Sequence, residues 1–171
     1  TNTNTYTGEA GLKLNFIDRL ILGIKEKKLG IAFSGSITKE SKIITSRNII
    51  KRAKTIMPYL KYDENPYMIV TDDGNLVWVL DAYTTSNNYP YSQETIIDYE
   101  GMKEKINYIR NSVKVIIDPY NGTTKFYITD TTDPIITSYK NIYPSLFEKE
   151  EIPENISKHL MYSKYLYNIQ A

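Results

Sequence analysis

The chain has 171 residues, and its 21 lysines and arginines balance 20 aspartates and glutamates to a net charge of +1. This length is typical of one domain, and the balanced charge provides no field of one sign that would attract nucleic acid as a main partner. Cysteine is absent and histidine occurs once, which excludes disulfides and a thiol nucleophile and disfavours a zinc or redox-metal site.

The N-terminal third is predicted to be helical after a polar start. Residues 1–7, TNTNTYT, are expected to form a disordered leader. Apolar residues then recur at helical spacing, which predicts an amphipathic helix over about 15–28. A second helix is expected over 46–57, where Ser46 would open it and Pro58 would end it.

Two antiparallel β-hairpins are predicted in the middle of the chain. YMIVT (67–71) and LVWVLDAYT (76–84) are rich in β-branched and aromatic residues and are separated by the turn sequence DDGN. The side chains on both faces of the second strand are largely apolar, so we expect both faces to be covered. The second hairpin spans about 108–130, with Asn121 and Gly122 at its reversal.

The segment between the hairpins shows little core-forming pattern. Residues 86–104 are therefore expected to form an irregular polar loop, or to carry a short helix near 93–105. No apolar run anywhere in the chain approaches the roughly 20 residues of a membrane span, so any contact with a membrane is expected through segments outside this chain.

The C-terminal part is predicted to be helical again. Asp133 and Pro134 are typical of a capped helix start, which predicts a helix over 134–143. Two short helices, about 153–160 and 164–169, would form a helical tail. Since strands and helices do not alternate along the chain, the two hairpins and these helices predict an α+β fold, in one domain over 8–171.

Motifs for catalysis or metal binding are weak. His159 has no nucleophile or carboxylate beside it in the sequence, and TDDGN (71–75) and TDTTDP (129–134) lack the alternating ligands of a calcium loop. The chain contains no phosphate-binding loop, nucleophile elbow or dinucleotide fingerprint. We therefore predict no metal and no cofactor, and we assign no catalytic residue.

The candidate site is the polar stretch DAYTTSNNYPYSQ (81–93), which begins inside a strand. A carboxylate there is costly unless it is paired or hydrogen-bonded. Asp81 would be satisfied by an ion pair with Arg110, or by hydrogen bonds from Thr84 and Thr85. The result is either a buried network that fixes the loop or a ligand-binding site. The candidate binding residues are Asp81, Tyr83, Thr84, Thr85, Asn87, Tyr89, Tyr91, Arg110 and Asn111.

Four stretches of the chain carry a family resemblance. They are SKIITSRNIIKRAKTIMPYLKYDENPYMIV, LVWVLDAYTTSNNYPYSQ, NYIRNSVKVIIDPYNGTTKFYITDTTDPIITSYKNIYPSLF and IPENISKHLMYSKYLYNIQ. In this order they resemble consecutive blocks of the soluble region of uncharacterised protein family 0182. One departure lies near the end, where the family usually has a proline and this chain has YSKYLYNIQ; Ser163 is expected to cap the last helix instead.

The resemblance implies a cellular location but no enzymatic reaction. Members of the family are large bacterial proteins with several membrane spans near the N-terminus, and this chain would be a fragment of their extracytoplasmic part. It implies a location at the cell membrane, on the extracytoplasmic side, with flanking segments of the same protein as partners. The lack of cysteine is compatible with the envelope of a Gram-positive bacterium.

Three functions remain open, of which we rank ligand binding or interaction first. Such a module would use the 81–93 loop with Arg110 and Asn111, and its tyrosines would suit an envelope glycan or peptide. A structural scaffold that packs on the rest of the protein would instead expose an apolar patch. A carboxylate-based hydrolase of an envelope polymer would need two carboxyl groups across a cleft, one of them with a raised pKa.

Overall fold

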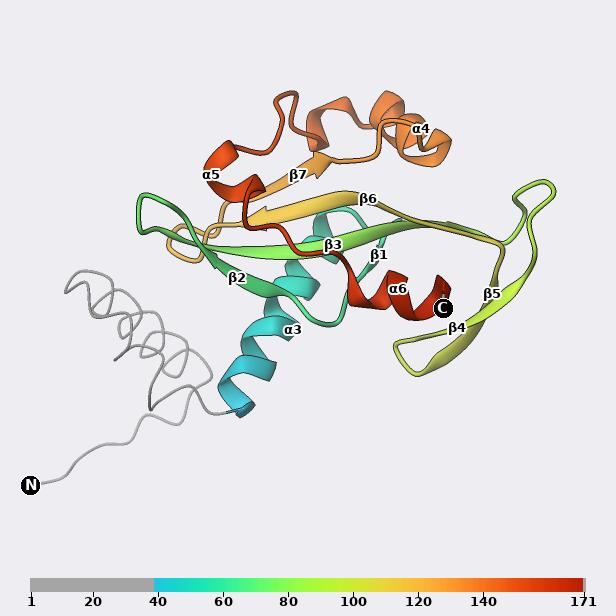
Figure 1. Ribbon diagram of the computed structural model, residues 1–171, viewed down its shortest axis with the longest axis horizontal. Helices are drawn as coiled ribbons and strands as arrows, with labels where there is room; N and C mark the ends of the chain where they lie inside the picture. The colour runs from blue at the N-terminus through green and yellow to red at the C-terminus, as the bar shows by residue number, and fades with distance from the viewer. Residues whose placement is uncertain (1–38, 171) are drawn as a thin grey trace, which may run out of the picture. The chain divides into compact units, whose positions relative to one another are not determined.

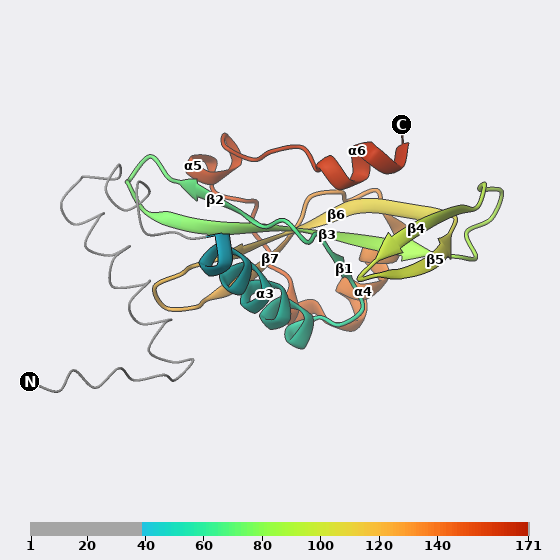
Figure 2. The same cartoon turned by 90° about the horizontal axis from the view of Figure 1, so that it is seen from below.

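A computed structural model describes residues 39–170, so the predicted leader and the predicted helix over 15–28 lie outside the described residues (Figure 1). Residues from Ser46 onward form one compact unit. Its centre is a five-stranded antiparallel sheet. Figure 2 shows two helices, α3 and α4, on one side of this sheet and the short helices α5 and α6 on the other. These layers confirm the α+β prediction; the single domain over 8–171 stays a prediction.

Helix α3 (Lys39–Ile56) begins seven residues earlier than predicted. The predicted start at Ser46 is wrong because good helix formers precede it and neither glycine nor proline interrupts the run from Lys39. The predicted end before Pro58 is confirmed. Ile49, Ala53 and the following Met57 are buried, and their spacing of four residues places them on one helix face against the sheet.

Both predicted hairpins are present in the sheet. β2 (Tyr67–Val70) pairs with β3 (Leu76–Ser86), and β6 (Tyr108–Ile117) pairs with β7 (Thr124–Ile128). The long strands β3 and β6 then pair with each other and join the hairpins at the centre. A short strand that was not predicted, β1 (Lys61–Tyr62), pairs with β3 beyond the end of β2.

Both faces of β3 are covered, as its two apolar sets predict. The main core lies on the side of α3 and α4, and a smaller core lies on the side of α5. Trp78 and Leu80 belong to the first core, whereas Val79 belongs to the second. The main core consists of Ile49, Ala53, Met57, Leu60, Tyr62, Trp78, Leu80, Ala82, Val113, Val115, Ile117, Phe126, Ile136 and Phe147.

The prediction of a loop or short helix within 86–104 is wrong, because a second, two-stranded sheet forms there. β4 (Thr95–Tyr99) and β5 (Met102–Ile106) are joined by Glu100 and Gly101, whose φ angles are 54° and 75°. Two central residues with positive φ are what a type I′ turn requires. Only Ile97, Tyr99 and Ile106 of this hairpin are buried, so its alternating apolar pattern in the sequence is short.

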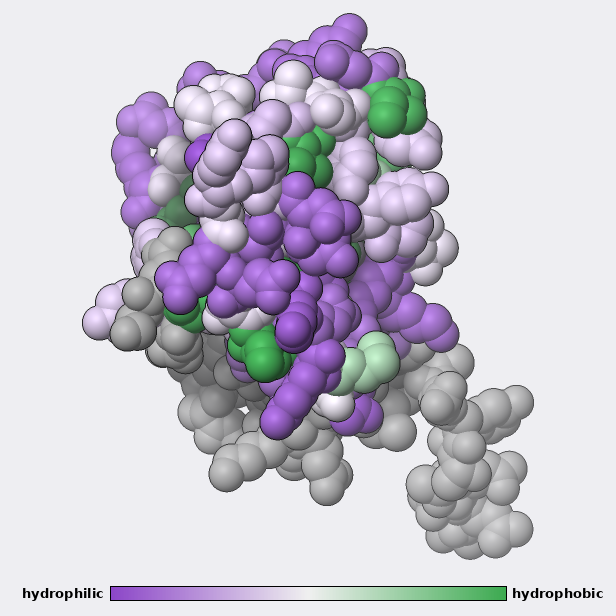
Figure 3. All heavy atoms as spheres, turned by 90° about the vertical axis from the view of Figure 1, so that its right-hand side faces the viewer, coloured by the Kyte–Doolittle hydropathy of each residue, from purple (hydrophilic) through white to green (hydrophobic). Residues whose placement is uncertain are grey.

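Polar contacts attach this hairpin to the rest of the unit. Lys54 forms an ion pair with Glu100, and Lys61 Nζ lies 2.6 Å from Glu104 Oε2. The hydroxyl of Tyr99 accepts a hydrogen bond from the Tyr62 amide at 3.0 Å. Figure 3 looks at the molecule from this end and shows a mainly hydrophilic surface on which hydrophobic areas are small and separate.

The C-terminal helices lie where they were predicted, although α5 covers only Glu154–Ser157 of the predicted 153–160. Asp133 caps α4 (Pro134–Ile142) by accepting the Ile135 amide at 2.9 Å. A 3-10 turn (Pro144–Leu146) and α5 (Glu154–Ser157) follow. Ser163 caps α6 (Lys164–Gln170), as expected, by accepting the Leu166 amide at 3.1 Å. Among the described helices none is long and apolar enough to cross a membrane.

Candidate functional site

A β-bulge in β6 determines which side chains face which side of the sheet. Ala82 pairs with Val113 and Thr84 pairs with Arg110, so the single residue between them on β3, Tyr83, stands opposite two residues of β6. These two residues are Asn111 and Ser112. A bulge changes the side on which neighbouring side chains emerge, and bulges are frequent next to functional sites.

Asp81 lies in a buried polar network, but its partners differ from both expected arrangements. Its direct cross-strand neighbour is Lys114, with which it forms an ion pair. Asn111 Nδ2 donates a second hydrogen bond to Asp81 Oδ1 at 3.2 Å. Asn111 and Lys114 are three residues apart, so regular alternation would place them on opposite faces. The bulge brings both to Asp81.

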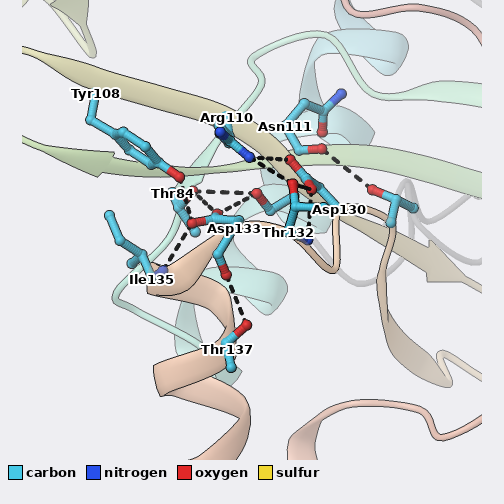
Figure 4. Close-up of polar contacts among 11 residues, drawn as sticks. Thr84, Tyr108, Arg110, Asn111, Asp130, Thr132, Asp133, Ile135 and Thr137 are labelled. Carbon is cyan, nitrogen blue, oxygen red and sulfur yellow. Dashed lines mark hydrogen bonds and ion pairs between the residues drawn. The ribbon is translucent and has the colours of Figure 1, made fainter. Parts of the chain in front are cut away.

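Arg110 pairs with Asp130 rather than with Asp81. Its Nη1 is 3.1 Å from Asp130 Oδ2 and donates to the Thr132 hydroxyl at 2.9 Å, as drawn in Figure 4. Hydrogen bonds from Thr132 lower the pKa of Asp130 against a smaller opposing effect of burial, and Arg110 adds to the lowering. Asp130 is therefore a carboxylate at neutral pH.

Thr84 belongs to a second buried network, which is centred on Asp133 (Figure 4). The Asp133 carboxylate accepts hydrogen bonds from the hydroxyls of Thr84, Ser112 and Tyr108, the last at 2.7 Å. Burial alone would raise the pKa of Asp133, but these donors and the Ile135 amide outweigh it and lower the pKa. This network connects the start of α4 to β3 and β6.

The predicted loop residues lie apart from the Asp81 network. The half-buried Tyr89 stacks on Tyr108 at a centroid distance of 4.3 Å, and the Asn107 side chain holds the Tyr89 backbone by two hydrogen bonds. Thr85 is half-buried at the end of β3. Asn87 and Tyr91 are exposed, and the φ angle of Tyr91 is 59°. The structure therefore distributes the nine candidate residues over several groups.

The segment that follows α5 covers the Asp81 side of the sheet. The Tyr83 hydroxyl donates to Asp63 Oδ2 at 2.8 Å and is hydrogen-bonded to Ser163. Lys114 Nζ donates to the Met161 carbonyl at 3.3 Å, and the Met161 amide donates to the Tyr67 hydroxyl at 3.1 Å. These contacts fix residues 160–166 above the central strands.

A cavity of about 600 Å³ lies between β6 and this segment. Its polar lining comes from Arg110, Asn111, Lys114 and Asp130. Its remaining lining is supplied by Ile109, Leu160, Met161, Tyr162 and Leu166. Among the described side chains no group of three histidines, aspartates or glutamates is arranged as metal ligands would be.

Asn111 carries an unsatisfied atom in this region. Its Oδ1 is buried and has no hydrogen-bond partner, which is true of no other buried side-chain polar atom in the part of the chain that the structure describes. Leaving a buried acceptor unpaired costs about 1–3 kcal/mol, and such groups in native proteins require an explanation. Stability alone therefore does not explain why an asparagine occupies position 111.

The sequence pointed to part of this site. Asp81, Arg110 and Asn111 were candidates, and the last two line the cavity. Lys114 was missed, although a lysine inside the apolar run SVKVII was a signal comparable to Asp81 in its own strand. Residues 160–166 were missed because no motif distinguishes them in the sequence.

Taken together, the molecule is an α+β domain with a partly polar cavity at the covered face of its sheet. The chain belongs to Uncharacterised protein family (UPF0182), whose model matches residues 1–171. A UPF0182 protein of Caldicellulosiruptor saccharolyticus is 48% identical over 97% of this chain, and one of Clostridium novyi is 48% identical over 99%. The chain spans 18% of the length of these curated relatives. No solved structure gives a significant match.

Proposed function

We propose that this chain is a ligand-binding domain on the extracytoplasmic side of a bacterial membrane protein. The observation that carries the binding function is the cavity of about 600 Å³, in which Arg110, Asn111 and Lys114 lie beside apolar side chains from residues 160–166. Cavities of roughly 300–1,000 Å³ with a few convergent polar groups are the usual form of small-molecule sites. The proposed extracytoplasmic location is supported by the resemblance of the sequence blocks to a family of membrane proteins.

A thermal-unfolding screen tests the binding function. The compounds are a disaccharide of the cell wall, a wall tetrapeptide, glycerol phosphate and divalent cations. Because a ligand that binds only the folded state stabilises it, we expect at least one compound at saturation to raise the unfolding midpoint by about 2 °C or more. Met161→Lys, which places a charge on the apolar side of the cavity, should abolish this shift.

Met102→Lys is the matched control for this screen, because Met102 is an exposed methionine on β5, 60% exposed against 52% for Met161, and does not line the cavity. Its response to the compounds should equal that of the unchanged protein. A screen in which no compound shifts a well-folded sample, or a shift that persists in Met161→Lys, would overturn the proposal.

A structural scaffold is the second candidate, and one surface favours it. Tyr59 is 57% exposed and lies between Tyr139 and Tyr143, with ring centroids 6.0 Å away in both cases. Ile142 beside them is 63% exposed. Exposed patches of this kind often contact other protein. A screen without any response would favour packing of this surface on other parts of the protein.

The hydrolase alternative finds no support in the described carboxylates near the cavity. A general acid needs a raised pKa, whereas hydrogen bonds from Thr132 lower the pKa of Asp130. Asp81 is covered and paired with Lys114. Both groups serve as fixed counter-charges.

A further inference from the structure

The charges around the cavity are already matched within the protein. Arg110 pairs with Asp130, and Lys114 pairs with Asp81. Two cations thus face two carboxylates, and a charged ligand would find no uncompensated counter-charge. A ligand that displaced the buried Lys114–Asp81 pair would leave a charge without a partner, which is strongly unfavourable. The electrostatics of the cavity therefore favour an uncharged ligand.

The hydrogen-bonding groups at the cavity include both donors and acceptors. Within the described chain the hydrogen bonds of Arg110 use only Nη1, although a guanidinium has five N–H groups. Asn111 Nδ2 gives one of its two hydrogens to Asp81. Asp130 is an acceptor, since a carboxylate accepts up to about four hydrogen bonds. Hydroxyl groups match this set, because each of them both donates and accepts.

The other side of the cavity is apolar. Ile109, Leu160, Met161 and Leu166 contribute hydrocarbon or thioether surface, and Tyr162 adds an aromatic ring. A ligand that fills the cavity must therefore present hydroxyls on one side and C–H groups on the other. A pyranose ring has this distribution, with hydroxyls at its edge and an apolar face that packs on aromatic and aliphatic side chains.

We infer that the cavity binds an uncharged carbohydrate, with its hydroxyls toward Arg110, Asn111 and Asp130 and its C–H face toward Met161 and Leu166. This inference rests on the proposed binding function and narrows it to one ligand class. It also gives a reason for the unsatisfied Asn111 Oδ1, because the side chain is then held in place for recognition at the expense of stability.

The test compares sugars that share a ring and differ in charge. Neutral glucose and N-acetylglucosamine, with their disaccharides, are compared with cationic glucosamine and anionic glucuronate by saturation-transfer NMR and calorimetry on the 171-residue chain. We expect a neutral sugar to bind and both charged analogues to bind at least about tenfold more weakly. Asn111→Ala should weaken the binding of the neutral sugar by at least about tenfold.

Asn88→Ala is the matched control, because Asn88 is exposed, is not among the candidate binding residues and does not line the cavity. Met161→Lys provides a second variant on an exposed residue, in case Asn111→Ala does not fold. Binding of a charged sugar or of the wall peptide, lost in Met161→Lys and without any neutral sugar bound, would overturn the carbohydrate inference and leave the binding function intact. Absence of all binding would overturn both.

Discussion

At the scale of single residues, the clearest feature is a buried ion pair at the centre of two apolar strands. The side chains of Lys114 and Asp81 are 9% and 6% exposed. A pair of this kind contributes little net stability compared with apolar residues of the same size, but removing one partner leaves the other charge buried and alone. The two residues should therefore be strongly coupled.

We predict that Asp81→Asn lowers the free energy of unfolding by about 3–5 kcal/mol, because it leaves the Lys114 ammonium buried without a counter-charge. Lys114→Met in the same chain should recover most of this loss, since the methionine fills a similar volume without a charge. Denaturant unfolding of the unchanged protein, both single variants and the double variant measures the coupling. Additive effects of the two substitutions would contradict the assigned partnership.

At the scale of elements, the β4–β5 hairpin forms a sheet of its own with a small core. It buries three apolar residues and depends on its turn and on two ion pairs. Gly101 has a φ of 75°, and a Cβ atom added to it would have nothing within 4 Å. A substitution there would consequently act through backbone conformation alone.

We predict that Gly101→Ala destabilises this hairpin by about 1 kcal/mol, the penalty for an L-residue in the left-handed region. Amide hydrogen exchange should accelerate at Ile97 and Ile106 and stay unchanged at Val79 and Val115. Gly74→Ala is the comparison, because Gly74 has the same open surroundings and a φ of 78° in the β2–β3 turn. Equal effects of both variants throughout the sheet would show that the hairpins do not open separately.

Elements with local signals were predictable, and the arrangements that depend on distant pairing were not. The caps at Asp133 and Ser163 need only neighbouring amides, so the sequence revealed both. The turn of β4–β5 was missed because Glu100 is an unusual residue at positive φ. The wrong partner for Asp81 has another cause, since the register of β3 against β6 brings together residues 33 positions apart.

At the scale of the whole molecule, the site depends on the order of the layers. β6 carries side chains to the Asp133 network and to the cavity, and the segment after α5 lines the opposite side of the cavity. The cavity consequently exists only when the C-terminal segment lies on the sheet. This could not be predicted, because residues 160–166 have no pattern that specifies what they cover.

The proposed extracytoplasmic location predicts on which side of the membrane this domain lies. This chain has no cysteine, so Asn87→Cys introduces its one thiol at an exposed position, and labelling is measured against the same full protein without the substitution. In intact bacteria that express the full family protein, a membrane-impermeant maleimide should label this thiol as fully as it does after lysis. Ala82→Cys, at a position with 0% exposure, should remain unlabelled in intact cells. Labelling of Asn87→Cys only after lysis would place the domain in the cytoplasm.

The bulge in β6 also has a consequence for chain length. Because one residue of β3 stands opposite two of β6, β6 contains one residue more than regular pairing needs. A chain shorter by one residue at Ser112 would still keep Arg110 opposite Thr84 and Lys114 opposite Asp81. It would lose one hydroxyl donor to Asp133, whereas Asn111, then two positions from Lys114, would stay on the Asp81 side by regular alternation. A deletion here would thus weaken the Asp133 network while preserving the register of the sheet, so the two faces of β6 can be altered separately at a single position.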